Sequence, residues 1–261
     1  MNKITKTAVI ALLGTSPPVI TEFVDYVEIV KEKRVSDLII ITTKEQNVLE
    51  GIPVIEYAIK NKYPHIHLHV VKLPFVDIFS DKENLEFMQK CAEILKEQKD
   101  IHKADYIYLC IAGGRKDMCI TLSLLAQFFK INGVFHIITP NVKSMNEELE
   151  RARYNIKELN EVEDKDNYYK QHKEMFDNLM FPHRSQYNII TIPILPYPQE
   201  ILEEIINIFN KQPINKENIK ISDSILKNME SLGLIILRKE KIIFWTNEGK
   251  KFSEILKVIL N

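Results

Sequence analysis

Short, continuously apolar runs alternate along the first part of the chain with stretches whose apolar residues recur every three or four positions. The unbroken runs predict strands that are buried on both faces, and the three-to-four spacing predicts helices between them. The expected strands are 8–13, 38–41, 66–73, 106–112 and 134–139. Strands and helices in strict alternation predict an α/β fold, Rossmann-like, with a mostly parallel sheet covered by helices on both faces.

The pattern loosens after the fifth strand into a polar segment rich in Glu, Asn and Lys, from about 142 to 186. Helical spacing at 149–159 and 168–180 predicts a helical insertion over the sheet. A late strand at 188–195 and an amphipathic helix at 200–209 then lead to Lys211-Gln212-Pro213. We therefore predict a first domain spanning residues 1–212.

The last segment, residues 213–261, has a different pattern. A helix at 222–231 precedes two short apolar runs, 234–237 and 242–245, that flank a charged tetrad, and a final helix begins near 247. Helix, β-ribbon and helix in this order predict a small winged helix-turn-helix-like domain.

Composition narrows the class of protein. The chain has 261 residues, 45% of them hydrophobic, and a formal net charge of -1, which argues against a globally basic nucleic-acid binder but leaves a local basic patch open. Three dispersed cysteines fit neither a zinc site nor a disulfide framework and favour a reducing, cytoplasmic setting. No apolar stretch approaches the ~20 residues of a membrane-spanning helix, so no membrane association is expected.

Two polar loops follow the first and fourth predicted strands. They are Gly14-Thr15-Ser16 and Gly113-Gly114-Arg115-Lys116. Both leave the carboxyl edge of the sheet, where ligands of open parallel sheets bind, so we expect them to be neighbours. Glycine permits close approach, a helix N-terminus favours an anion, and Arg and Lys suit phosphate. A plain turn with an N-cap, and a solvated basic turn, remain the alternatives for the first and second loop.

The order and strand context of these two loops resemble those of CRISPR-associated Rossmann-fold (CARF) proteins, over roughly residues 7–140. The resemblance implies a homodimer that binds a cyclic oligoadenylate, such as cyclic tetra-adenylate, across its interface. It further implies a ring nuclease in which Lys116 stabilises charge on the pentavalent phosphate and Ser16 orients the 2′-hydroxyl or the phosphate. The RNA's own 2′-OH is then the nucleophile, and neither metal nor cofactor is needed.

Further candidate contacts lie in the loop after the second strand, where Thr42, Thr43 and Lys44 are expected to meet adenine or ribose unless the loop is simply solvated. His65, His67 and His69 share one face of a strand, but without an evident carboxylate partner we expect no metal site.

A transcription regulator that binds the ring without cutting it is the alternative function. Residues 215–261 carry 9 Lys/Arg against 6 Asp/Glu, an excess of +3. The candidate DNA contacts are Lys227 on the helix before the ribbon and Arg238, Lys239 and Lys241 in the ribbon's turn. A structural or dimerisation role for this segment is also open, as is an unrelated nucleotide-binding α/β enzyme, although the first loop lacks the dinucleotide fingerprint G-x-G-x-x-G.

Overall fold

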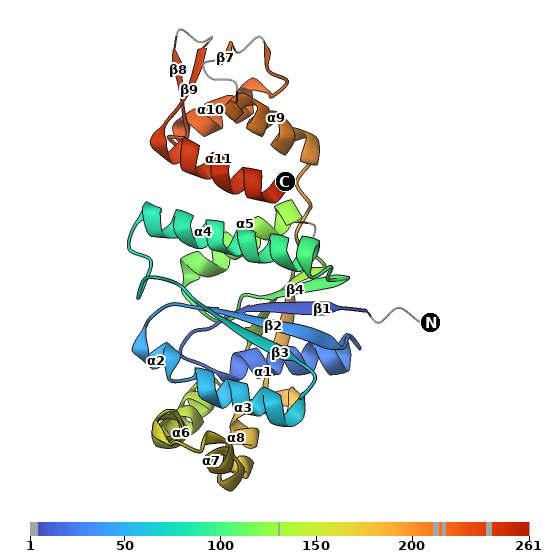
Figure 1. Cartoon of the computed structure of the whole chain (residues 1–261), viewed down its shortest axis with the longest axis vertical. Coiled ribbons are helices and arrows are strands. Elements are labelled where there is room, and N and C mark those ends of the chain that lie inside the picture. The colour runs from blue at the N-terminus through green and yellow to red at the C-terminus, as the bar shows by residue number, and fades with distance from the viewer. Residues whose placement is uncertain (1–4, 130, 211–213, 216–217, 239–241, 261) are drawn as a thin grey trace.

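A computed structural model describes residues 5–129, 131–210, 214–215, 218–238 and 242–260 (Figure 1). Within these ranges, six strands form the main sheet in the order β3-β2-β1-β4-β5-β6. Their bounds are β1 Thr7–Leu12, β2 Val35–Thr42, β3 His67–Lys72, β4 Tyr106–Cys110, β5 Gly133–Ile138 and β6 Asn188–Ile192. β1 to β5 pair in parallel, and β6 runs antiparallel to β5. The predicted mostly parallel α/β sheet is confirmed.

The central strand β1 explains why both faces of the sheet are covered. Every residue of β1 is buried, and successive side chains enter opposite cores. The helices that cover the sheet are α1 Pro18–Asp25 (continued by the π-helical η1 Tyr26–Val30), α2 Gln46–Leu49, α3 Ile52–Lys62, α4 Asp81–Lys96 (continued by η2 Glu97–Ile101) and α5 Lys116–Phe129. Val9 and Ala11 pack with α1 and α3, whereas Ile10 and Leu12 pack with α4 and α5 on the opposite face.

The helical insertion forms an outer layer on the α1–α3 side of the sheet (Figure 1). It contains α6 Val142–Glu161, α7 Lys165–Gln171, α8 Lys173–Met180 and the short η3 Arg184–Gln186. The insertion contacts α1 and α3, so it lies over these helices instead of directly over the strands. The single helix expected at 168–180 is divided in two at His172, and the fully buried Tyr169 and Phe176 stack at 5.1 Å between ring centroids.

The C-terminal part has its own small core. It contains α9 Gln199–Asn210, β7 Ile214–Asn215, α10 Asp223–Ser231, β8 Ile235–Arg238, β9 Ile242–Trp245 and α11 Asn247–Leu260. The strands pair in the order β7-β9-β8. Leu202, Ile205 and Ile208 of α9 pack in this C-terminal core, which favours a boundary before α9. The boundary predicted at 212–213 itself lies outside the described residues.

The two parts meet along α11, which packs against α4 as well as α9 (Figure 1). Ile255 of α11 is 1% exposed and belongs to the apolar core under α4 and α5. No helix in the described ranges is long and apolar enough to cross a membrane.

Candidate functional site

The two glycine-containing loops lie in direct backbone contact, as the sequence predicts. A Cβ atom added to Gly14 would stand 2.9 Å from the Gly114 nitrogen, and one added to Gly113 would stand 2.0 Å from the Leu12 carbonyl oxygen. Gly114 adopts a φ of +76°, which side chains rarely tolerate. Only glycine fits these positions, so the close approach of the loops depends on them.

A cavity of about 310 Å³ opens beside this contact. Its wall combines the loops after β1, β2 and β4, which all end at the carboxyl edge of the sheet. The polar and glycine positions among its lining residues are Gly14, Thr15, Thr43, Glu45, Gly114 and Arg115. Because α5 begins immediately after the second loop, the free N–H groups and dipole of its first turn favour an anion here, whereas α1 begins at Pro18, directly after Pro17, and these two residues have no N–H to donate.

The two cations of the second loop have different surroundings. Arg115 forms an ion pair with Asp77 at 2.5 Å, and the two side chains are 58% and 13% exposed. Asp77, in the loop after β3, also accepts a hydrogen bond from the Ile78 backbone N–H through its other carboxylate oxygen. Lys116 is exposed as the first residue of α5 and forms no ion pair with any described residue. Lys116 is thus the cation that is ready to meet an anion.

Ser16 and the loop after β2 depart in part from the expected contacts. The Ser16 Oγ atom is buried and has no hydrogen-bond partner among the described residues, and Ser16 does not line the cavity. Thr42 is fully buried, so its side chain has no surface to present to a ligand and we leave it out of the candidate site. Thr43 lines the cavity, whereas the exposed Lys44 does not. The Lys44 backbone N–H donates a hydrogen bond to the Phe75 carbonyl oxygen at 2.9 Å.

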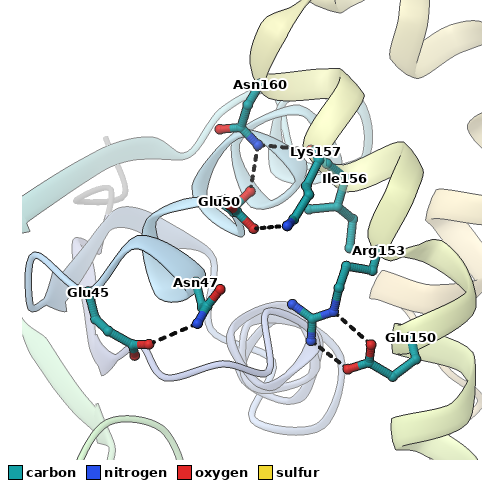
Figure 2. A network of polar contacts seen from close by, with 8 residues as sticks. All are labelled: Glu45, Asn47, Glu50, Glu150, Arg153, Ile156, Lys157 and Asn160. Carbon is teal, nitrogen blue, oxygen red and sulfur yellow. Dashed lines mark hydrogen bonds and ion pairs between the residues drawn. The ribbon is translucent and has the colours of Figure 1, made fainter.

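The insertion reaches this region through its helix α6 (Figure 2). The sequence predicted a helical insertion but not this contact. Asn160 Nδ2 donates to the Glu50 carbonyl at 2.8 Å, and Lys157 lies 3.8 Å from the Glu50 carboxylate. Arg153 is held by Glu150 in a two-pronged pair at 2.6 and 2.8 Å, beside a small cavity that Thr15 also lines. The first loop is therefore bordered by α6 as well as by the sheet.

A second pocket, of about 270 Å³, lies at the same sheet edge between α1, the loop after β5 and the insertion. Glu22 of α1 lines it, is only 1% exposed, and has no hydrogen-bond partner for either carboxylate oxygen among the described residues. Burial raises the pKa of Glu22 from 4.5 to about 7, partly countered by Arg184 and reinforced by Asp25. No local pattern in the sequence marks this pocket, because Glu22 is one of two carboxylates in an otherwise mostly apolar α1.

His67 and His69 lie on β3 as predicted, whereas His65 lies in the turn before that strand, and all three have carboxylate neighbours. His67 and His69 lie 3.9 and 3.8 Å from Asp37 of β2, and His65 lies 3.0 Å from Glu28. These partners come from distant parts of the sequence and were not evident from it. In the part of the chain that the structure describes, no three His, Cys, Asp or Glu side chains are grouped to hold a metal ion.

The candidate DNA contacts are sparse. Lys227 is exposed on α10, but Asp223 and Glu230 lie on the same short helix, and Glu230 accepts a hydrogen bond from the Leu237 backbone at 3.0 Å. Arg238 is exposed at the end of β8. Lys239 and Lys241 lie outside the described residues.

Residues 16–225 match the sequence profile of a family described as CRISPR-associated protein NE0113. The chain belongs to this family. The match begins at Ser16 of the first loop, includes the whole of the second loop, the insertion and α9, and ends within the first turn of α10. No match is found among proteins with curated functions.

Two solved structures resemble this NE0113-family protein. Enterococcus italicus Csm6 bound to cyclic hexa-2′-fluoro-hexa-dAMP is 12% identical, with a TM-score of 0.50 over 79% of this chain and 47% of the Csm6 chain. Can2 from Sulfobacillus thermosulfidooxidans in complex with cyclic tetra-adenylate is 11% identical, with a TM-score of 0.34 over 97% of this chain and 63% of the Can2 chain. The NE0113-family chain thus spans about half the length of Csm6, with which it shares the fold.

Proposed function

We propose that this protein binds a cyclic oligoadenylate, of which cyclic tetra-adenylate is the first candidate, and cleaves it as a ring nuclease that ends CRISPR signalling. The observation that carries the proposal is the close contact of Gly14 with Gly114, which builds one cavity from the loops after β1, β2 and β4, with Arg115 in its wall and Lys116, which has no ion-pair partner among the described residues, next to Arg115 in the chain. Membership of a CRISPR-associated family and the cyclic nucleotide held by Csm6 support this choice of anion.

In the proposed reaction, a ribose 2′-oxygen attacks the adjacent phosphorus and the bond to the 5′-oxygen breaks. The 2′-hydroxyl loses its proton and the departing 5′-oxygen gains one, which gives a 2′,3′-cyclic phosphate and a 5′-hydroxyl. Lys116 stabilises the extra negative charge of the pentavalent phosphate, and the Ser16 hydroxyl, which is buried and without a partner among the described residues, turns toward the ligand to orient the 2′-hydroxyl or the phosphate. Aligned donors of this kind each contribute about 10²–10³ in rate. The nucleophile belongs to the substrate, so the proposed step needs no metal.

A homodimer suits such a ligand, because a two-fold ring offers the same groups to each of two symmetric protomers. Two cuts at equivalent phosphates would convert cyclic tetra-adenylate into two linear di-adenylates. A homodimer is therefore part of the proposal.

The test is a cleavage assay with full-length protein, cyclic tetra-adenylate and excess EDTA, resolved by chromatography and mass spectrometry. We expect di-adenylate with a 2′,3′-cyclic phosphate, and a rate that falls about 10²–10³-fold in Lys116→Ala while ring binding is largely kept. Lys99→Ala is the matched control, since Lys99 is an exposed lysine of η2, in the connection that enters β4 at the opposite edge of the sheet. An intact ring after long incubation with stoichiometric protein would refute cleavage.

The three-stranded sheet and α10 support a second candidate, a regulator that binds the ring and DNA without cutting the ring. Its test is a mobility shift of DNA from upstream of the protein's own gene, with and without the ring, at several salt concentrations. A ligand-dependent, salt-sensitive shift combined with an uncut ring would establish it. No shift at low salt would exclude it.

A further inference from the structure

The pocket around Glu22 takes no part in the proposed cleavage step. It nevertheless has the properties of a ligand site, because the buried side chain of Glu22 lines it and neither carboxylate oxygen has a hydrogen-bond partner among the described residues. Leaving such a group unsatisfied costs free energy, so a ligand in the pocket that reaches the carboxyl group would relieve that cost.

We propose that this pocket binds one adenine base of the ligand, with the Glu22 carboxyl group facing the N1 and N6 edge of the base. The proposal deepens the proposed function and rests on it, since it assigns a base of the same cyclic oligoadenylate.

The size and lining of the pocket fit a single heterocycle. Whole ligands occupy pockets of about 300–1,000 Å³, so 270 Å³ suits a part of a ligand. Pro18, Pro140 and Met145 supply apolar surface for the faces of a flat ring, and Asn141 and Ser144 supply polar groups at the rim.

The hydrogen-bonding groups of a neutral Glu22 are compatible with adenine. Adenine presents an N6 amine, which donates, beside the ring nitrogen N1, which accepts. A neutral carboxylic acid matches both, because its carbonyl oxygen accepts from N6 while its O–H donates to N1. A neutral acid can also pair with the ring N–H and carbonyl of guanine or uracil, so the choice of adenine comes from the proposed ligand. The pKa of Glu22, raised by burial to about 7, keeps the neutral acid available near neutral pH.

The charged and titratable groups around Glu22 come from five elements. Arg184 favours the ionised form, but its guanidinium stacks on the rings of Tyr26 and Tyr187, at 5.0 and 4.8 Å from their centroids. The groups that face Glu22 or share its pocket are Arg184 of η3, Asp25, which follows it on α1, Glu148 of α6, Tyr187 before β6 and Cys110 of β4. Desolvation outweighs the attraction to Arg184, so the carboxyl group remains easy to protonate.

The pocket also lies where a base of the proposed ligand would be. Pro18 of its wall comes two residues after Ser16, and Thr139 follows β5, the strand beside β4. Both openings therefore belong to the carboxyl edge of the sheet. A nucleotide with its phosphate at the glycine loops and its base at Glu22 would follow that edge.

The experiment is calorimetric titration of the full-length Lys116→Ala protein with cyclic tetra-adenylate between pH 6 and pH 8.5, so that the ring stays intact. We expect affinity to fall with pH above about 7, with a slope that approaches tenfold per pH unit, as the competent neutral form is depleted. Glu22→Gln should bind at pH 8 as it does at pH 6, because an amide presents the same acceptor and donor without titrating. Glu22→Leu should lose at least tenfold at pH 6.

Glu148→Gln is the matched control, since Glu148 lines the same pocket as an exposed carboxylate, and it should keep the parent pH profile. If the ring binds and both Glu22 variants show the parent's affinity and pH profile, the base site is refuted while the proposed function stands. If the parent and the unsubstituted protein fail to bind the ring at any pH, the proposed function itself fails.

Discussion

Replacing Glu22 with glutamine should make the folded protein more stable at alkaline pH. The Glu22 carboxyl group is 1% exposed and unpaired, so its ionisation in the folded state is opposed by desolvation. Glutamine has nearly the same shape and no charge to desolvate. Its effect on stability should therefore grow with pH.

The magnitude follows from the pKa of Glu22, which rises from 4.5 to about 7 on folding. Below pH 4.5 both states hold the proton and there is no penalty. Between pH 4.5 and 7 the unfolded chain releases the proton while the folded chain retains it, so stability falls as the pH rises. Above pH 7 the loss levels off at about 3 kcal/mol, from ~1.4 kcal/mol per pH unit.

The assay is urea unfolding of both proteins at intervals from pH 4.5 to pH 8, followed by circular dichroism. The difference in unfolding free energy between Glu22→Gln and the parent should increase by about 3 kcal/mol across this range, or by roughly 6–12 °C in melting temperature. Glu148→Gln should show no comparable trend, since its side chain is exposed. A constant difference between Glu22→Gln and the parent would refute the reasoning, because it would mean that Glu22 titrates alike in both states.

Three further predictions follow from the same contacts. Gly113→Ala should lower the free energy of unfolding by about 3 kcal/mol or more, since its Cβ would stand 2.0 Å from the Leu12 carbonyl oxygen. Gly233→Ala, at a φ of +68° with open space around it, should lower it by only about 1–2 kcal/mol, and thermal melting of the two variants would test this difference. Cys110 should resist a thiol reagent at pH 8 until urea is added, because burial raises its pKa to about 12, and rapid labelling of the native protein would contradict this. Light scattering should give twice the 30.6 kDa chain mass, and a monomer both with and without the ring would contradict the dimer.

The sequence was informative wherever one physical rule determined the outcome. Unbroken apolar runs such as Leu38–Ile41 can be buried only in the middle of a covered sheet, so the strands and their parallel direction followed. In the same topology, the loops that leave the carboxyl ends of parallel strands lie at one edge of the sheet. This predicted that the loops after the first and fourth strands are neighbours, as the contact of Gly14 with Gly114 shows. The antiparallel direction of β6 was not predictable in this way, because it depends on where the insertion delivers the chain.

Contacts between segments far apart in the sequence were beyond prediction. Asp77 lies in the loop after β3, yet it forms an ion pair with Arg115, 38 positions later. Glu22 had no local signal of its environment, because its burial depends on an insertion that starts more than a hundred residues downstream. Similarly, α9 joins the C-terminal core through Leu202, Ile205 and Ile208, although its amphipathic pattern suits either core.

The Arg115–Asp77 pair changes how the phosphate site should work. The guanidinium expected to clamp a phosphate already binds a carboxylate, so an anion must share it with Asp77 or displace Asp77. Exposed pairs contribute only about 0–1 kcal/mol, and Arg115 is 58% exposed, so displacement would cost little. Until then the pair neutralises one cation, and the N-terminal end of α5 attracts the anion. Arg115 should therefore contribute to ring binding only after the ligand has moved it from Asp77, whereas Lys116 should act mainly in the cleavage step.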